Sequence, residues 1–181
     1  MTPNADQETP LERYSLVARA LHWIMAILIL FNLWLGLAHE SLPRDWQVMP
    51  VHKSVGLTVL ALAILRLVWR LTHRQTPLPE GLPAWEKLAA KVTHYTFYAF
   101  MLLVPLTGWI MSSAGKYPLN WFFLFDMPKF GVTKDDAIVG FSAEAHEIFA
   151  YFWIALLILH IAAALRHHFI LRDDVLRRML G

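Results

Sequence analysis

Histidine is the residue type in this chain that is best suited to chemistry. The sequence has nine histidines and no cysteine, so a metal site would rely on imidazole, and disulfides and iron–sulfur clusters are excluded. Four histidines lie inside long apolar segments: His22, His52, His146 and His160. An ionisable side chain is costly in such surroundings and is usually functional. These four histidines are therefore the main candidates for functional residues.

The spacing of two of these histidines places them on one face of a helix. His146 and His160 are 14 residues apart, which corresponds to about 21 Å of rise and about 40° less than four complete turns. One turn after each of the four candidates comes a small residue, so the helix surface beside each ring is flat. The small residues are Ala26, Gly56, Ala150 and Ala164. The pattern predicts imidazole groups at two levels, each beside a flat helix surface.

Four apolar runs carry these histidines, and each approaches or exceeds the roughly 20 residues that a membrane-spanning helix needs. Hydrophobic residues make up 57% of the chain and charged residues 17%, which argues against a disordered chain or a soluble enzyme. The sequence predicts an all-α integral membrane four-helix bundle, a single domain over residues 1–181, with the first run retained rather than cleaved as a leader. The predicted helices cover residues 15–38, 51–72, 88–113 and 143–171.

The distribution of cations predicts how the bundle is oriented. In a four-span arrangement, the side that holds both termini carries eleven of the sixteen lysines and arginines. Cytoplasmic flanks carry such an excess, so both termini should be cytoplasmic, in a bacterial inner membrane. The connections over residues 40–50 and 113–144 should then lie outside. The net charge of +2 gives no reason to expect a nucleic-acid partner, and membrane lipid is the expected surrounding.

This topology assigns a depth to each candidate histidine. His22 and His160 fall near the cytoplasmic side, whereas His52 and His146 fall near the outer side. Two imidazoles that face each other can hold a planar metal macrocycle, whereas a bare zinc ion prefers three or four clustered ligands. The prediction is therefore two haems, one with its iron between His22 and His160 and the other between His52 and His146. His94 is a competing ligand at the inner level, where its expected role is a hydrogen bond to a propionate, a quinone or a loop.

The motifs around these residues resemble those of the bacterial cytochrome b561 family, four-helix dihaem membrane proteins that include superoxide oxidase. The resemblance covers most of the chain and puts the four family ligands on His22, His52, His146 and His160. It implies two noncovalently bound b-type haems, with electrons passing from superoxide outside to ubiquinone at the inner haem. The motifs that carry it are Arg19 with Leu21-His22-Trp23, Val51-His52-Lys53-Ser54-Val55-Gly56, Pro105 and Gly108, Ala145-His146-Glu147, and Leu159-His160 through His167-His168.

Charged residues near the predicted haems are candidates for supporting roles. Lys53 is the best candidate to attract superoxide, together with the loop lysines 116, 129 and 134, although ordinary interfacial solvation explains them as well and the aspartates 126, 135 and 136 oppose it. His167 is expected to supply a proton to the quinone, or else to join a basic flank that contacts lipid headgroups. Arg19, Arg66 and Arg70 should pair with propionates of the inner haem or extend to the interface.

Three functions remain open on the sequence alone. The leading one is a superoxide:ubiquinone oxidoreductase that acts by itself. The second is a cytochrome b electron-transfer subunit of a hydrogenase or dehydrogenase complex, whose outer loop would dock a partner protein. The third is a haem-free proton or ion transporter in which the buried histidines form a relay. The sequence contains no motif that separates the two oxidoreductase functions.

Overall fold

The computed structural model describes residues 13–74, 76–77 and 81–180, and its main elements are four long helices. Each of the four is long and apolar enough to cross a membrane, which confirms the predicted helical membrane bundle. They are α1 (Leu16–Ala38), α2 (Val48–Thr72), α3 (Ala84–Ser113) and α4 (Ala137–Arg166). The short elements are η1 (Arg44–Trp46), β1 (Asn120–Trp121), β2 (Phe125–Asp126), the π-turn η2 (His167–Leu171) and α5 (Arg177–Leu180).

The helix boundaries differ from the predicted ones mainly at the helix starts. α2 begins at Val48 rather than residue 51, α3 at Ala84 rather than 88, and α4 at Ala137 rather than 143. The prediction located apolar runs, whereas the backbone of a helix stays hydrogen-bonded where it extends beyond the hydrocarbon into polar surroundings. At its other end, α4 changes at His167 from α-helical to π-helical hydrogen bonding.

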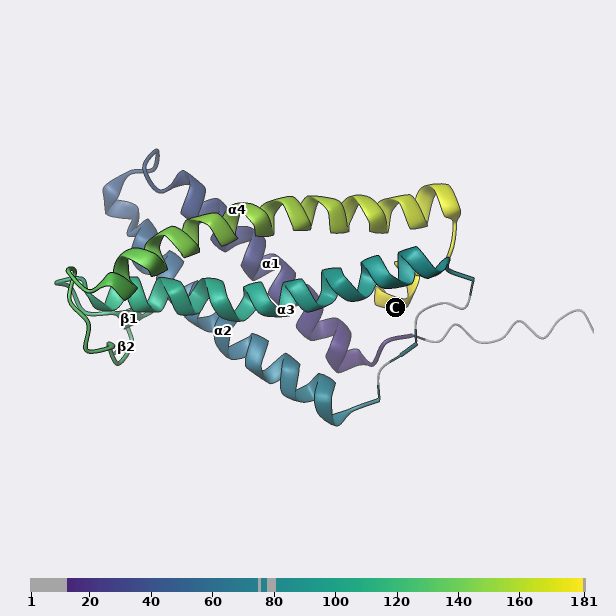
Figure 1. Ribbon diagram of the computed structural model, residues 1–181, viewed down its shortest axis with the longest axis horizontal. Coiled ribbons are helices and arrows are strands. Elements are labelled where there is room, and N and C mark those ends of the chain that lie inside the picture. Colours follow the sequence, from purple (N-terminus) through teal and green to yellow (C-terminus); the bar gives the residue numbers. More distant parts are fainter. Residues whose placement is uncertain (1–12, 75, 78–80, 181) are drawn as a thin grey trace, which may run out of the picture.

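The helices pack in chain order. The closely packed pairs of long helices are α1 with α2, α2 with α3 and α3 with α4, and in the described part of the chain α4 makes no comparable approach to α1 or α2. The start of α1 and the C-terminal segment lie at one end of the bundle, here called the terminal end (Figure 1). The β1–β2 hairpin lies at the opposite end, here called the hairpin end (Figure 1).

The buried core occupies the middle of the bundle, between the two levels of histidines. It draws on all four long helices, and its members are Met25, Ile29, Val55, Val59, Ala63, Met101, Val104 and Trp153. Many large apolar side chains of the same helices are exposed, as expected where lipid rather than water surrounds a bundle. The core therefore separates the two levels.

The hairpin is docked on the start of α2 by polar contacts. Ser54 Oγ accepts a hydrogen bond from the Phe122 backbone N–H at 2.9 Å, and Thr58 Oγ1 accepts one from Trp121 Nε1 at 3.0 Å. The turn needs left-handed backbone at Phe122 and Phe123, with φ of 47° and 61°. The aromatic side chains at its tip are exposed, which suits a segment at a membrane interface.

The C-terminal segment folds back across the terminal end. After η2 the backbone turns at Arg172, whose φ is 56°. The carbonyl oxygens of residues 178 and 179 then accept hydrogen bonds from the Tyr14 backbone N–H at 3.2 Å and from Trp23 Nε1 at 3.1 Å. Arg178 Nη1 donates to the Pro77 carbonyl at 2.9 Å. These contacts tie α5 to α1 and to the segment before α3.

Candidate functional site

Two pairs of imidazole rings face each other at the two levels of the bundle. The ring centroids of His22 and His160 are 6.3 Å apart, and those of His52 and His146 are 6.2 Å apart. The structure thus brings together the same pairs that the predicted depths matched. In each pair one ring comes from α4 and the other from α1 or α2, the helices that do not pack closely against α4.

The separation of each pair suits one metal ion shared by two rings. An imidazole–metal bond is about 2 Å and the ring centre lies about 1 Å beyond the nitrogen, so two rings on opposite sides of one ion have centres about 6 Å apart. Within the described residues, no group of three or more His, Cys, Asp and Glu side chains could hold a bare metal ion. Two imidazoles supply only the axial positions, so the pairs fit a macrocyclic metal such as haem.

At the hairpin end, backbone carbonyls orient both rings. His52 Nδ1 lies 3.0 Å from the Asn32 carbonyl oxygen, and His146 Nδ1 lies 2.8 Å from the Val104 carbonyl oxygen. A carbonyl only accepts hydrogen bonds, so each Nδ1 must carry the proton and donate it. This tautomer leaves Nε2 as the nitrogen with a free lone pair, which is the arrangement that metal-binding histidines use.

Two glycines make these carbonyl contacts possible. Gly36 lies four residues after Asn32, and Gly108 lies four residues after Val104. A Cβ at position 36 would come within 3.0 Å of His52 Cε1, and one at position 108 would come within 3.0 Å of His146 Cε1. Each ring therefore packs over a glycine of a neighbouring helix to reach the carbonyl one turn earlier. Sequence reasoning had looked for small residues on the histidine's own helix and missed this role.

At the terminal end, charged and aromatic side chains surround the pair instead. His22 Nδ1 lies 3.4 Å from Arg66 Nη2. The guanidinium carbons of Arg66 and Arg70 lie 5.9 and 5.5 Å from the centre of the Tyr98 ring. Two of the three arginines that were predicted to pair with propionates, Arg66 and Arg70, therefore lie at the level of this pair. The third, Arg19, is half-buried in the first turn of α1, and its side chain makes no hydrogen bond or ion pair with the described residues.

His160 has two further ring neighbours on α3. The Phe97 ring centroid is 5.2 Å from that of His160, and the His94 centroid is 6.4 Å away. By distance alone His94 is thus as close to His160 as His22 is. Helix packing favours His22 over His94 as the second ligand. α3 packs closely against α4 whereas α1 does not, and a flat macrocycle needs room between the two ligand-bearing helices.

Trp153 lies midway between the two levels and was missed in the sequence. It is seven residues from both His146 and His160, so it shares their face of α4. Its side chain is buried, and within the described residues its Nε1 has no hydrogen-bond partner. The spacing of seven residues to each of the two histidines was the sequence signal that could have identified Trp153. An aromatic ring is thereby placed in the core between the two pairs.

Cations at the hairpin end adjoin one of the pairs. Lys53 follows His52 directly and is half-buried, close enough to Lys129 for their charges to interact. Lys129 Nζ also donates to the Gly115 carbonyl at 2.6 Å. Two of the aspartates that could oppose an anion have local partners. Asp126 accepts from Asn120, and Asp136 accepts from the Thr133 backbone N–H.

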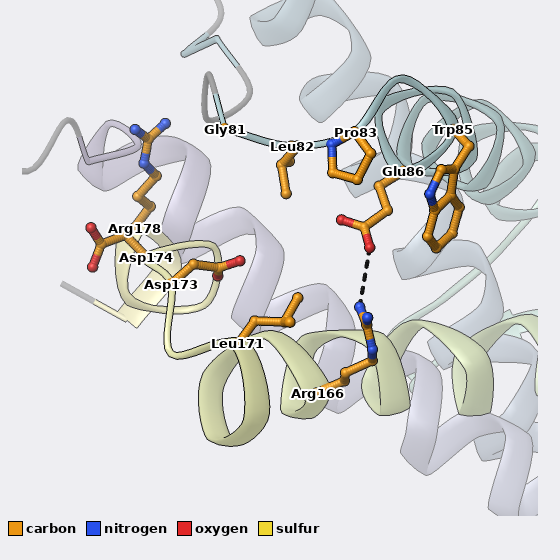
Figure 2. A pocket seen from close by; sticks show the side chains of 10 residues that line it. All are labelled: Gly81, Leu82, Pro83, Trp85, Glu86, Arg166, Leu171, Asp173, Asp174 and Arg178. Atoms are coloured by element: carbon orange, nitrogen blue, oxygen red, sulfur yellow. Dashed lines mark hydrogen bonds and ion pairs between the residues drawn. The ribbon is translucent and has the colours of Figure 1, made fainter.

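At the terminal end, His167 bridges two carboxylates. Its Nδ1 lies 2.5 Å from Asp173 Oδ2, and its Nε2 lies 3.9 Å from Glu86 Oε2. Glu86 also accepts a hydrogen bond from Arg166 at 3.1 Å (Figure 2). Sequence analysis singled out His167 but neither carboxylate, because Glu86 and Asp173 lie 87 positions apart in the chain and only the fold joins them.

Comparisons with known proteins agree with this architecture. The family model for prokaryotic cytochrome b561 matches residues 13–181. Cytochrome b561 homolog 2 of Escherichia coli K12 is 32% identical over 177 residues, covering 94% of this chain and 92% of the relative. Cytochrome b561 homolog 1 of the same organism is 28% identical over 176 residues, covering 94% and 98%. A protein of Yersinia pestis named probable superoxide oxidase CybB is 27% identical over 175 residues, covering 93% and 96%.

A match over nearly the whole chain accompanies four helices that are long and apolar enough to span a membrane, and two facing imidazole pairs. Both features suit haem b and the transfer of electrons in a membrane. The chain belongs to the prokaryotic cytochrome b561 family.

Proposed function

We propose that this protein is a dihaem b-type cytochrome that carries single electrons from superoxide at the hairpin end to ubiquinone at the terminal end. The observation that carries the proposal is the presence of two facing imidazole pairs, at two depths, whose ring centroids are 6.3 and 6.2 Å apart. Two levels about 21 Å apart along α4 suit transfer across a membrane better than a single reaction site does.

The proposed ligands are His52 with His146 at the hairpin end and His22 with His160 at the terminal end. Haem b bound there supplies one-electron chemistry, and an imidazole on each side of its iron leaves no open position for oxygen. The carbonyls of Asn32 and of Val104 hold the hairpin-end rings in the metal-binding tautomer. At the terminal end, Arg66 and Arg70 are placed to pair with propionates; Arg19 is the weaker candidate.

The hairpin end suits an anionic electron donor. Lys53 and Lys129 raise the local concentration of an anion beside His52, an effect that salt should screen. Local partners engage Asp126 and Asp136. The Yersinia pestis relative carries the name of a superoxide oxidase, which supports superoxide as the donor. The excess of lysine and arginine at the terminal end supports an orientation with both termini in the cytoplasm of a bacterial cell and the hairpin end outside.

The terminal end suits an acceptor that takes up protons with its electrons. Ubiquinone binds two protons on full reduction, and imidazole exchanges protons near neutral pH. His167 lies seven residues beyond His160, about 10 Å along the helix. Its side chain is 12% exposed and contacts an acidic partner on either side. His167 is the proposed carrier of protons to the quinone at this end.

The test combines haem analysis with turnover. The purified protein should contain two b-type haems per chain by pyridine haemochrome assay. It should reduce a short-chain ubiquinone when superoxide is generated by xanthine oxidase, with two superoxide ions consumed per quinone. Lys53→Gln should lower the rate severalfold and weaken its dependence on ionic strength, whereas Lys91→Gln, an exposed change at the opposite end, should not.

Other outcomes would favour the alternatives. Two haems without superoxide-driven quinone reduction, together with a dehydrogenase or hydrogenase partner that reduces the haems, would make this an electron-transfer subunit. A folded protein that takes up no haem when haem supply is adequate would instead leave proton or ion transport as the function of the buried histidines.

A further inference from the structure

A cavity opens at the terminal end between the start of α3 and the C-terminal segment. Its volume is about 600 Å³, within the range of small-molecule sites. It combines apolar walls with acidic and basic groups (Figure 2). The lining residues that matter here are Leu82, Trp85, Glu86, Leu171, Asp173 and Arg178.

One carboxylate oxygen in this cavity has an ion-pair neighbour but no hydrogen bond with the described residues. The Glu86 side chain is 10% exposed, and its Oε1 is held by Arg166 at 3.1 Å. Its Oε2 is buried and makes no hydrogen bond with any described residue. Burying a carboxylate oxygen without a hydrogen bond is costly, so this atom is suited to a ligand that donates or exchanges a proton. Arg178 Nε, also in the cavity lining, is a second buried polar atom without a described hydrogen-bond partner.

His167 connects that oxygen to a second carboxylate nearer to water. The exposed fraction of the side chain rises from 10% for Glu86 and 12% for His167 to 28% for Asp173. His167 can accept a proton on Nδ1 from the Asp173 side, 2.5 Å away, and release one from Nε2 toward Glu86 Oε2, 3.9 Å away. The π-helical turn makes this possible, because it starts at His167 and leads into the reversal that brings Asp173 back. π-turns of this kind are frequent at functional sites.

We propose that Asp173, His167 and Glu86 form a proton path that delivers protons to a quinone reduced in the terminal-end cavity. The inference rests on the proposed function and deepens it. The overall reaction is 2 O₂•⁻ + Q + 2 H⁺ → 2 O₂ + QH₂, in which two superoxide ions are oxidised and one quinone is reduced. Both protons come from the aqueous phase at the terminal end. Each passes from Asp173 through the His167 ring to Glu86, which donates it to a quinone oxygen.

The other groups around the cavity position the two partners. Arg166 fixes Glu86 through Oε1 and leaves Oε2 for the proton. Arg178 Nη1 is engaged with the Pro77 carbonyl, so its Nε remains to donate to the second quinone carbonyl. Trp85, Leu82 and Leu171 provide apolar surface for a flat ring. Asp174 also lines the cavity, but its carboxylate is paired with Arg177 at 3.6 Å.

The test separates electron entry from proton delivery. Full-length protein with both haems is mixed with superoxide, and haem reduction and quinone reduction are followed separately. Glu86→Gln keeps a group for Arg166 but cannot carry a proton on that oxygen. It should leave haem reduction within about twofold of wild type and slow quinone reduction by about a hundredfold. Asp173→Asn should act in the same direction, with a smaller loss because water can partly replace it.

A matched control is Asp135→Asn, the same carboxylate-to-amide change at the hairpin end, which should slow neither rate, because removing a negative charge there does not hinder an anionic donor. Proton delivery should also give a solvent deuterium isotope effect on quinone reduction that is larger in Asp173→Asn than in wild type, which a merely structural role would not cause. Retention of both haems shows that a variant is folded, and Asp173→Asn carries the test if Glu86→Gln does not fold.

The outcomes distinguish the two proposals. Wild-type quinone reduction with unchanged rates in Glu86→Gln and Asp173→Asn would overturn the proton path and leave the proposed function standing. Haem reduction by superoxide without quinone reduction in wild type would overturn both. Equal slowing of haem and quinone reduction in the variants would also overturn the path, because the carboxylates would then be structural.

Discussion

The two imidazole pairs have nearly the same separation but are surrounded in different ways. At the hairpin end, both rings are oriented by main-chain carbonyls and pack over glycines: Asn32 with Gly36, and Val104 with Gly108. At the terminal end, the neighbours of the pair are side chains, chiefly Arg66, His94 and Phe97. The comparison shows that one ligand geometry can be built either from the backbone or from side-chain chemistry.

The difference has a consequence for how each pair is controlled. A carbonyl cannot titrate, so the backbone acceptor that selects the tautomer of each neutral ring at the hairpin end does not itself change with pH. Side-chain charges at the terminal end can instead stabilise added negative charge, because a guanidinium favours the more reduced state of a neighbouring redox group. The hairpin-end pair is thus controlled mainly by shape and the terminal-end pair mainly by charge.

The largest expected effect is the loss of one haem from either level. His52→Ala should remove the hairpin-end haem and His160→Ala the terminal-end haem, since each takes away an axial ligand, while the core between the levels remains intact. Pyridine haemochrome assay should give about one haem per chain in each variant, and reduced-minus-oxidised spectra should show different remaining components. His168→Ala, a change at a histidine outside both pairs, is the control that should retain two haems.

Loss of both haems from a stable, folded His52→Ala protein would contradict the expectation that the two levels bind haem independently. It would mean that the two levels assemble as one unit. The buried core residues, Trp153 among them, would then transmit the loss from one level to the other rather than keep the levels apart.

The next effect comes from crowding the hairpin-end rings. Gly36→Ala and Gly108→Ala each place a methyl carbon about 3.0 Å from a ring carbon. Overpacking of this kind costs about 1–3 kcal/mol, or roughly 5- to 150-fold in affinity. Haem titration of the apoprotein should therefore show weakened binding at the hairpin end and unchanged binding at the terminal end.

A matched control separates crowding from the general effect of glycine. Gly140 lies in α4, and a Cβ there meets nothing within 4 Å. Gly140→Ala should stabilise the helix by about 0.5–1 kcal/mol and leave both haems in place. Equal binding by Gly36→Ala, Gly108→Ala and Gly140→Ala would show that the rings move away from the methyl group and that the carbonyl contacts do not decide ligation.

The same comparison explains what could be predicted from the sequence. Residue type, spacing and hydropathy were enough for the membrane bundle, for the pairing of the four histidines by depth, and for Arg66 and Arg70 beside the terminal-end pair. All of these depend on side chains that the sequence names and on a helix period that fixes their faces. Apolar runs located the spans but not the first residues of α2, α3 and α4, which begin three to six positions before the predicted starts.

The rest depended on contacts that residue type does not reveal. The carbonyls of Asn32 and Val104 carry no sequence signal, because every residue has one. Gly36 cannot be distinguished in the sequence from other small residues of a membrane helix, because its role depends on the His52 ring that packs over it. Glu86 and Asp173 meet through the π-turn at His167 and the reversal at Arg172, neither of which a helical period predicts. The unpredicted details therefore depend on main-chain contacts at the hairpin end and on a chain reversal at the terminal end.

A smaller effect should follow from removing charge at the terminal end. Arg66→Gln takes away a cation that lies 3.4 Å from His22, so the reduced state of the terminal-end haem loses stabilisation. Its midpoint potential should fall by up to about 60 mV, the shift that corresponds to a tenfold change for one electron. The hairpin-end potential should not change. Spectroelectrochemical titration measures both, with the exposed Arg74→Gln as the control, and a fall in the hairpin-end potential alone would reverse the assignment.

The smallest effect is expected from His94→Ala, and it sharpens the terminal-end assignment. The His94 and His22 centroids are 6.4 and 6.3 Å from that of His160, so distance does not choose between them. Helix packing favours His22, because α3 packs closely against α4 whereas α1 does not, and a macrocycle needs room between its two ligand-bearing helices. His94→Ala should thus retain two haems with only a small spectral change, whereas His22→Ala should lose one. The opposite result would move the terminal-end haem to α3 and leave His22 as a partner of Arg66.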